Sequence, residues 1–123
     1  MANILIVDDD PAIRELIQDV LAENGGHTFD QASNGDEALK KIRAARFNLV
    51  ILDRGMPKMD AMQVLRQLRS SPATANLKVL ICTGSGMMSD VEEALSAGAS
   101  DYIVKPLDFA MLNIKVGRLT RNG

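Results

Sequence analysis

The sequence of 123 residues contains one cysteine, one histidine and no tryptophan, and it has no long apolar run. A single cysteine cannot form an internal disulfide, and the apolar residues before Cys82 indicate a buried thiol that packs as a small hydrophobic side chain. A membrane span needs about 20 apolar residues, and the N-terminus lacks the basic start and cleavage site of a secretory signal. We therefore expect a soluble protein of the reducing cytoplasm.

A strong charge of one sign is also missing. The chain has 14 Lys and Arg and 16 Asp and Glu, which gives a formal net charge of −2. This balance offers no electrostatic reason to expect nucleic acid or a membrane surface as a direct partner.

Five aliphatic segments alternate with five segments of helical periodicity, which is the pattern of a repeated βα unit. The first and third of these segments are almost continuously apolar, as is typical of a parallel sheet covered on both faces. Right-handed crossovers then predict a doubly wound α/β fold, and the length favours one domain over residues 1–123. The expected strands are residues 3–7, 27–32, 48–53, 77–82 and 101–104.

The first helix has both a start and a stop signal. Asp10 can cap the helix, and Pro11 suits its first position because proline has no N–H to leave unpaired. Gly25-Gly26 can end it, because glycine accepts the left-handed backbone found after helices.

Two further helix starts are indicated by paired polar residues. Asn34 is followed three residues later by Glu37, an arrangement that satisfies free N–H groups at a helix start. Ser89 and Glu92 have the same spacing. Each helix also has one apolar face, formed by Ile13, Leu16, Ile17, Val20 and Leu21, by Ala38, Leu39 and Ile42, by Val64, Leu65 and Leu68, by Val91, Ala94 and Leu95, and by Phe109, Leu112, Val116 and Leu119.

Polar side chains gather where the expected strands end. Ligands of doubly wound sheets bind outside the carboxyl ends of the strands. The sequence therefore brings three carboxylates, a hydroxyl and an ammonium group to one edge of the sheet. They belong to Asp8 and Asp9 after the first strand, Asp53 at the third, Thr83 after the fourth and Lys105 after the fifth.

Carboxylates that share a site repel one another unless a cation offsets their charge. Mg²⁺ fits, with Mn²⁺ as an alternative, because such an ion takes one or two carboxylates and leaves a position for a phosphate oxygen. An aspartate beside the ion can act as a nucleophile towards a phosphoryl group, and Asp53 is the candidate. Lys105 and backbone N–H groups can stabilise the transferring oxygens, and Thr83 can donate its hydroxyl to one of them.

Four blocks of the sequence form a recognisable set in this order. They are Ile-Leu-Ile-Val-Asp-Asp-Asp at 4–10, Asp-Arg-Gly-Met-Pro at 53–57, Thr83, and Ala-Gly-Ala-Ser-Asp-Tyr-Ile-Val-Lys-Pro at 97–106. Together they resemble the receiver domains of bacterial two-component response regulators, such as the chemotaxis regulators, and the resemblance covers essentially the whole chain. It implies a flavodoxin-like (βα)5 fold, with a five-stranded parallel sheet in the order 2-1-3-4-5 and helices on both faces.

The resemblance also implies a phosphoacceptor switch that catalyses only its own phosphorylation and dephosphorylation. In this family the residue matching Asp53 is phosphorylated by a histidine kinase or a phosphotransfer protein. The residues matching Asp8, Asp9 and Asp53 bind Mg²⁺, and the backbone carbonyl matching Gly55 completes the metal site.

The remaining roles concern the switch itself. The hydroxyl of Thr83 is expected to move towards the phosphoryl group while the ring of Tyr102 turns inward. This would reshape the face made by the fourth and fifth helices and the fifth strand, through which receivers dock to a target or dimerise. Lys105 is expected to pair with the phosphoryl group, and its bond to Pro106 is expected to be cis, which costs only about 0.5–1 kcal/mol before proline.

Two positions bear on the expected lifetime of the phosphoryl group. Gly55 and Ser85 stand two residues beyond Asp53 and Thr83, where polar or charged side chains often influence dephosphorylation. Because glycine cannot orient an attacking water through a side chain, we hypothesise a long-lived phosphoryl state.

Three other functions fit the sequence less well. A receiver-like module that is never phosphorylated is disfavoured by the intact acidic cluster. A Mg²⁺-dependent phosphatase with an aspartyl nucleophile would carry that nucleophile after the first strand, in an Asp-x-Asp motif followed by small residues. Here Asp-Asp-Asp-Pro follows the first strand, and the best nucleophile, Asp53, comes after the third. A flavin-binding protein needs a first loop that accepts phosphate, which three aspartates repel. The kinase, the pathway and the oligomeric state stay open, as does the choice between a stand-alone regulator and a piece of a longer protein.

Overall fold

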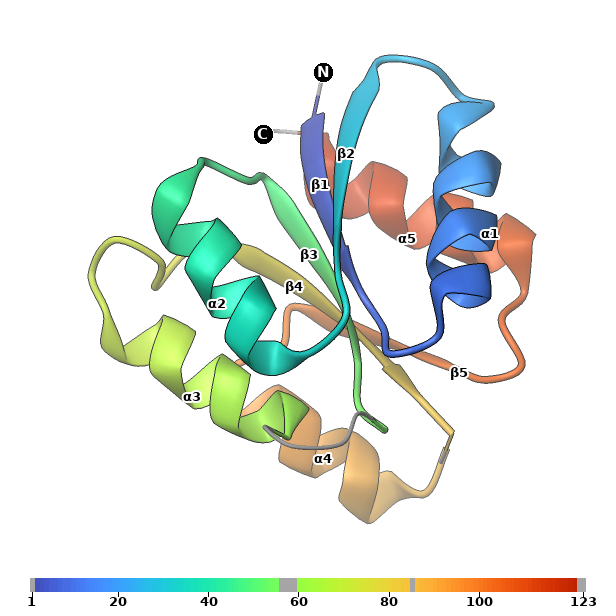
Figure 1. Cartoon of the computed structure of the whole chain (residues 1–123). Coiled ribbons are helices and arrows are strands. Elements are labelled where there is room, and N and C mark those ends of the chain that lie inside the picture. Colours follow the sequence, from blue (N-terminus) through green and yellow to red (C-terminus); the bar gives the residue numbers. More distant parts are fainter. Residues whose placement is uncertain (1, 56–59, 85, 122–123) are drawn as a thin grey trace.

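The structure, a computed structural model, describes residues 2–55, 60–84 and 86–121. Strands and helices alternate regularly through these residues (Figure 1). The elements are β1 (Ala2–Val7), α1 (Pro11–Ala22), β2 (His27–Ala32), α2 (Gly35–Ala44), β3 (Leu49–Asp53), α3 (Ala61–Ser70), β4 (Lys78–Thr83), α4 (Met88–Ser96), β5 (Asp101–Val104) and α5 (Phe109–Thr120).

The five strands form one parallel sheet in the order β2-β1-β3-β4-β5, which confirms the predicted topology. Strands β2 and β5 have the predicted bounds, β1 and β3 differ from the prediction by one residue at their start, and β4 is shifted by one residue at both ends. Every residue of β3, at the centre of the sheet, is buried. The continuous apolar strands are explained by this position, because helices cover both faces.

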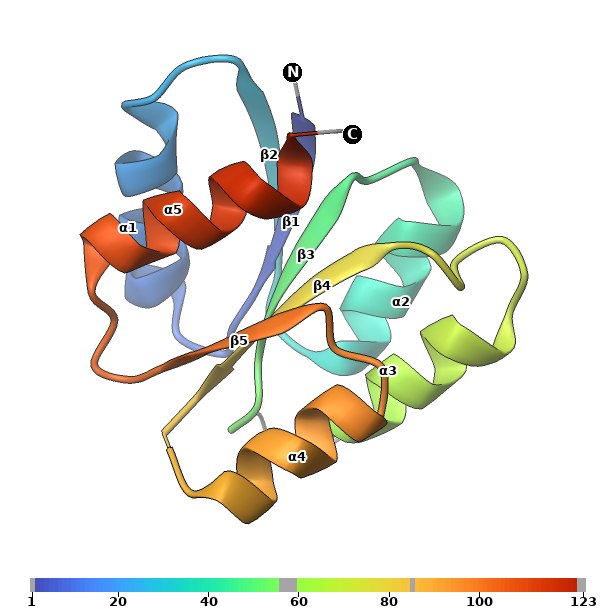
Figure 2. The same ribbon diagram turned by 180° about the vertical axis from the view of Figure 1, so that it is seen from behind.

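The helices divide between the two faces of the sheet. Helices α1 and α5 lie on one face, and α2, α3 and α4 pack on the other (Figures 1 and 2). Two apolar clusters follow from this division, one on each side, and the alternating residues of β1, β3 and β4 contribute to both. Cys82 of β4 belongs to one of these clusters and is 2% exposed, as predicted.

Side chains cap most of the helices. A carboxylate oxygen of Asp10 accepts the Ala12 N–H at 2.9 Å, which confirms the predicted start of α1. The side chain of Asn34 accepts the Glu37 N–H at 2.9 Å, as predicted for α2, while Glu37 reaches back to the N–H of Ser33. Helix α3 has a capping box between Asp60 and Gln63 that the sequence analysis did not identify. No described helix is both long and apolar enough to span a membrane.

The predicted cap of α4 by Ser89 is wrong. Met87 occupies the cap position and makes no side-chain hydrogen bond there. Helix α4 therefore begins at Met88, and Ser89 and Glu92 both lie inside it. The N–H groups of Asp90 and Val91 instead donate to the carbonyl of Met87.

Three of the predicted inward-facing residues are largely exposed. Leu16 of α1 and Leu95 of α4 are each 43% exposed, and Phe109 of α5 is 38% exposed. They lie at the margins of apolar faces whose centres, such as Ile17 and Leu112, are buried. Helical spacing predicts a face, but the width that is covered depends on the neighbouring elements.

Candidate functional site

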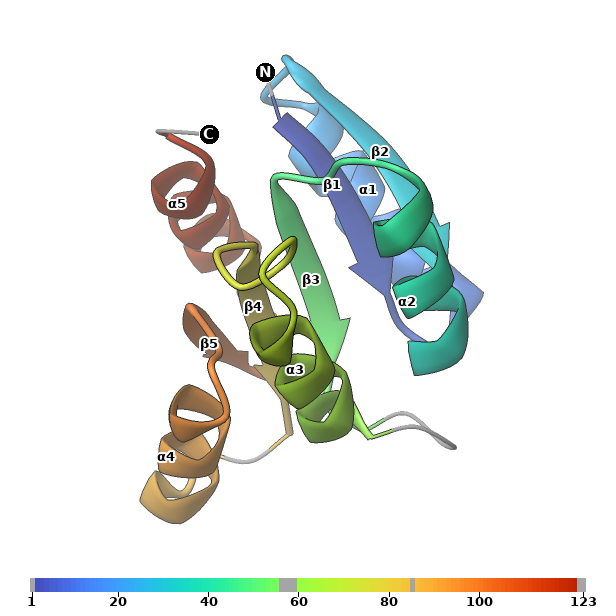
Figure 3. The same cartoon turned by 90° about the vertical axis from the view of Figure 1, so that its left-hand side faces the viewer.

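The carboxyl ends of the parallel strands lie at one edge of the sheet (Figure 3). The predicted polar residues stand at these strand ends. Asp8 follows β1, Asp53 ends β3 and Thr83 ends β4. Each of these three residues is only 4% exposed, whereas Asp9 is exposed. Buried polar side chains at the ends of otherwise apolar strands are costly unless they have partners or a function.

The ammonium of Lys105 pairs with Asp53, with Nζ 2.7 Å from Oδ1. The loop after β5 is held in place by the backbone, because the N–H of Lys105 donates to the carbonyl of Thr83 at 2.7 Å. The Lys105–Pro106 peptide bond is cis, as expected. The lysine, the aspartate and the threonine thus come together from three neighbouring strands.

The three carboxylates of Asp8, Asp9 and Asp53 each offer an oxygen within 4.8 Å of the others. Burial raises the pKa of Asp8, and the charges of Asp53 and Asp9 act in the same direction. The N–H of Asp10, which donates to Asp8 Oδ1 at 2.9 Å, and the nearby Lys105 oppose this shift without cancelling it. Among the described residues, the cluster of three carboxylates has one ammonium partner, Lys105, and so keeps an excess of negative charge.

The pKa of Lys105 results from opposing effects. Burial favours the neutral amine, but the hydrogen bond and the charge of Asp53 outweigh burial and raise the pKa of Lys105 above its ordinary value. The lysine is therefore a cation at neutral pH and offsets one of the carboxylates.

Cation ligands of this kind match a hard divalent ion. Carboxylate oxygens gathered from two loops, with one exposed member, can bind Mg²⁺ while leaving room for water and a further ligand. A bound cation would stabilise the charged form of Asp8 and so oppose the rise in its pKa that burial and the neighbouring carboxylates cause. The donor set of the described residues therefore fits the ion predicted from the sequence.

The backbone after Asp53 is anchored on both sides. The N–H of Gly55 donates to Asp53 Oδ1 at 3.2 Å, and the N–H of Arg54 donates to the carbonyl of Cys82 at 2.9 Å. The other members of this sequence block, Met56 and Pro57, lie outside the described residues, as does Ser85.

Arg54 is a residue that the sequence analysis did not single out. Its guanidinium donates to the backbone carbonyl of Asp90 at 3.1 Å and pairs with the carboxylate of Glu93, both on α4. The partners are 36 and 39 residues away along the chain, so no local pattern could have indicated them. The residue next to Asp53 thus ties the site to α4.

Tyr102 lies on β5 beside the strand that ends in Thr83. It pairs with Ile81 in the sheet register, two residues before the pairing of Thr83 with Val104. The ring is half-buried against the apolar cluster of α2, α3 and α4. The ammonium of Lys115 lies 4.9 Å from the ring centroid and 3.0 Å from Asp101, so α5 contacts β5 through this cation.

Comparison with known proteins agrees with the resemblance. Residues 4–116 match the family described as the response regulator receiver domain. The chain is 39% identical to the chemotaxis protein CheY of Bacillus subtilis over 104 residues, which cover 85% of each protein. It is 37% identical to the transcriptional regulatory protein ResD of the same species over 97% of the chain, but it spans only 48% of ResD.

Solved structures give the same result. The chemotaxis response regulator CheY4 of Vibrio cholerae superimposes with a TM-score of 0.89 at 28% sequence identity, over 97% of this chain and 98% of that protein. The family match covers most of the chain, and the sheet order and the acidic cluster accompany it. This chain belongs to the receiver domain family of two-component response regulators.

Proposed function

We propose that residues 1–123 form a single receiver domain that works as a phosphoacceptor switch in the cytoplasm, with Asp53 as the acceptor. The observation that carries this proposal is the pairing of Asp53 with Lys105 inside a cluster of carboxylates. A carboxylate oxygen of Asp53 would form the new P–O bond, while the bond from phosphorus to the donor breaks. The donor would be the phosphohistidine of a sensor kinase or of a phosphotransfer protein.

Asp8, Asp9 and Asp53, with the backbone carbonyl of Gly55, would hold Mg²⁺ or Mn²⁺. When bound, the ion supplies positive charge that offsets the carboxylates and the phosphoryl oxygens. The protein contributes the rest. Lys105 would pair with a phosphoryl oxygen, and Thr83 would donate its hydroxyl to another.

The output would pass through Thr83 and Tyr102 to the face formed by α4, β5 and α5. Movement of the Thr83 hydroxyl towards the phosphoryl group would open space into which the ring of Tyr102 can turn. Exposed apolar side chains on the two helices of this face support its use for partner binding or dimerisation. They are Met88 and Leu95 on α4 and Met111 and Ile114 on α5.

The phosphodonor protein would dock beside the site on a second surface. A groove of about 300 Å³ runs from Lys105 along α1 and the start of α5. Its apolar lining includes Leu16, Pro106 and Phe109. Because the lysine that pairs with Asp53 belongs to this groove, a donor seated there would lie beside the acceptor and would contact α5 only at its first residue.

The proposal is tested by incubating the protein with Mg²⁺ and acetyl phosphate and measuring the intact mass. We expect one phosphoryl adduct, which is lost with a chelator or with Asp53→Asn. The matched control is Asp36→Asn, which removes an exposed carboxylate on α2. No adduct on a folded protein would favour a receiver-like interaction module, and catalytic turnover of phosphoesters would favour an aspartyl-nucleophile phosphatase.

A further inference from the structure

Positive charge is concentrated in parts of the chain that lack acidic residues. Segments 38–52, 61–89 and 109–123 contain no Asp or Glu, yet they carry ten of the fourteen Lys and Arg residues. The near balance of charge in the whole sequence conceals this separation. The acidic cluster occupies the carboxyl edge of the sheet, so the opposite edge is where an excess of positive charge can collect.

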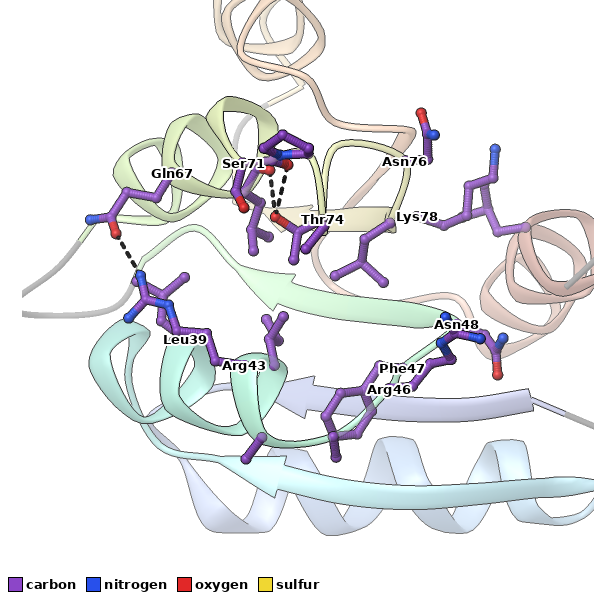
Figure 4. Close-up of a pocket in the computed structure, with 18 of the residues that line it drawn as sticks. Leu39, Arg43, Arg46, Phe47, Asn48, Gln67, Ser71, Thr74, Asn76 and Lys78 are labelled. Carbon is purple, nitrogen blue, oxygen red and sulfur yellow. Dashed lines mark hydrogen bonds between the residues drawn. The ribbon is translucent and has the colours of Figure 1, made fainter.

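A cavity of about 860 Å³ lies at that opposite edge, at the amino ends of β3 and β4 (Figure 4). Residues 42–48, from the last turn of α2 to the start of β3, form one wall. The segment between α3 and β4 forms another, and the end of α5 contributes Arg118 and Leu119. Arg43, Arg46, Lys78 and Arg118 all line it, and no Asp or Glu of the described residues does.

Hydrogen bonds hold both walls in place. The side chain of Asn48 accepts the Asn3 N–H at 2.7 Å, and the Asn3 side-chain amide donates to the carbonyl of Arg46 at 2.6 Å. On the other wall, the Thr74 hydroxyl donates to the carbonyl of Leu68 at 2.6 Å, and Arg69 donates to the carbonyl of Thr74 at 3.2 Å. The cavity is therefore largely preformed, as small-molecule sites are.

The cations of the cavity are not neutralised by the described part of the protein. Arg43 makes one long hydrogen bond to the neutral Gln67, at 3.4 Å, and no ion pair within the described residues involves Arg46, Lys78 or Arg118. Cations near helix C-termini are common, because each terminus carries about half a negative charge. Three helices end here, so their combined charge of roughly −1.5 leaves the four cations in excess.

We propose that this cavity binds a small phosphate-bearing anion of about nucleotide size. The cations would contact the phosphates, and the side chains of Ser71 and Asn76 supply further hydrogen-bond donors. Phe47 and Leu77 provide apolar lining for a base or similar group. A concave, preformed site of this volume suits a small ligand, whereas the phosphate backbone of nucleic acid is bound by basic surfaces that extend along it.

The test is a titration of the ¹⁵N-labelled full chain, followed by amide chemical shifts, with ATP and with inorganic pyrophosphate. Divalent cations are left out so that phosphates cannot bind through a metal at the acidic cluster. We expect saturable shifts confined to residues 43–48, 71–78 and 118–119. Adenosine, which lacks phosphate, should bind far more weakly.

Matched variants separate a site from general electrostatic attraction. Each lost charge-assisted hydrogen bond costs roughly tenfold in affinity, so Arg46→Gln with Lys78→Gln should weaken ATP binding at least that much. Arg66→Gln removes an exposed cation of α3 that does not line the cavity and should change affinity by less than about twofold. Asp53→Asn should leave ATP binding unchanged, because phosphoacceptance uses the other edge of the sheet.

Several outcomes would overturn the proposal. Absence of localised shifts at millimolar ATP would do so, as would equal losses in Arg66→Gln and the double variant. Tighter binding of a short oligonucleotide or an acidic peptide at the same residues would show a surface for a macromolecule instead. The amide spectrum of each variant reports directly whether it is folded.

Discussion

The ammonium of Lys105 lies 2.7 Å from Oδ1 of Asp53, across the intervening strand β4. The aspartate side chain is 6% exposed and the lysine side chain 36%, so the carboxylate is the buried partner. A buried charge whose partner is removed is strongly destabilising, whereas an exposed one is not. Breaking the pair therefore measures how much the clustered carboxylates lower the free energy of unfolding when Asp53 has no partner.

Replacing Lys105 by methionine is expected to lower the free energy of unfolding by about 1–3 kcal/mol without divalent cations, because Asp53 loses its partner among three carboxylates. Urea denaturation measures the change. Lys115→Met is the control, since it breaks the 3.0 Å pair with the more exposed Asp101 and should cost less. Equal losses in the two variants would contradict this account.

Asp8→Asn is expected to stabilise the metal-free protein at neutral pH by on the order of 1 kcal/mol, or several degrees in Tm. The pKa of Asp8 is raised in the fold, mainly by burial. The folded state then binds more protons than the unfolded state between 3.8 and the raised pKa, so stability falls as the pH rises through that window.

The raised pKa of Asp8 also predicts how the stability gained by Asp8→Asn depends on pH and on Mg²⁺. The gain from Asp8→Asn should shrink as the pH is lowered into the window, where native Asp8 is itself protonated. Saturating Mg²⁺ should stabilise the native sequence more than the variant. Thermal unfolding with and without Mg²⁺ measures both, and a variant that is less stable at neutral pH without metal would show the sign to be wrong.

Arg54→Ala is expected to loosen α4, because the guanidinium of Arg54 binds both the Asp90 carbonyl and the Glu93 carboxylate. Glu93 is half exposed, so the loss is modest, and amide exchange in Met88–Ser96 should accelerate several-fold rather than by orders of magnitude. Arg66→Ala on α3 is the control. Unchanged exchange in α4 would show that Arg54 does not hold the helix.

Cys82 is expected to be unreactive in the native protein. Burial raises the pKa of its thiol to about 12, and reaction with disulfide reagents requires the thiolate. An aromatic disulfide reagent at neutral pH should modify no thiol until urea is added, when one equivalent reacts. Rapid modification of the folded protein would mean that the strand opens readily.

The long-lived phosphoryl state hypothesised from Gly55 is tested by Gly55→Asn. Among the described residues, a Cβ at this position would meet Asp53 Oδ1 at 3.8 Å, an ordinary van der Waals contact, so a side chain can be added. An amide that orients water should shorten the phosphoryl half-life several-fold, while Gly55→Ala, which adds no polar atom, should not. A half-life of seconds in the native sequence, without a phosphatase, would refute the hypothesis.

Much of the fold was predictable because the signals are local. Apolar runs placed all five strands to within one residue at each end, and Asp10 and Asn34 indicated the starts of their helices. The start of α4 was not predictable, because several residues near Met87 can begin this helix and the packing of the whole helix selects among them. Ser89 was therefore wrongly predicted as its cap. Exposure of Leu95 and Phe109 likewise depends on neighbours distant in sequence.

Local patterns predicted a parallel sheet and the gathering of Asp8, Asp53, Thr83 and Lys105, because the carboxyl ends of parallel strands meet at one edge. The strand order was predicted from the resemblance to receiver domains. The partners of Arg54 on α4 and the cationic cavity at the amino edge became apparent only in the tertiary structure. These depend on loops and helix ends that are far apart along the chain. The periodicity of a strand depends on residues that are neighbours in the sequence, whereas contacts between side chains of separate elements form only when those elements pack together.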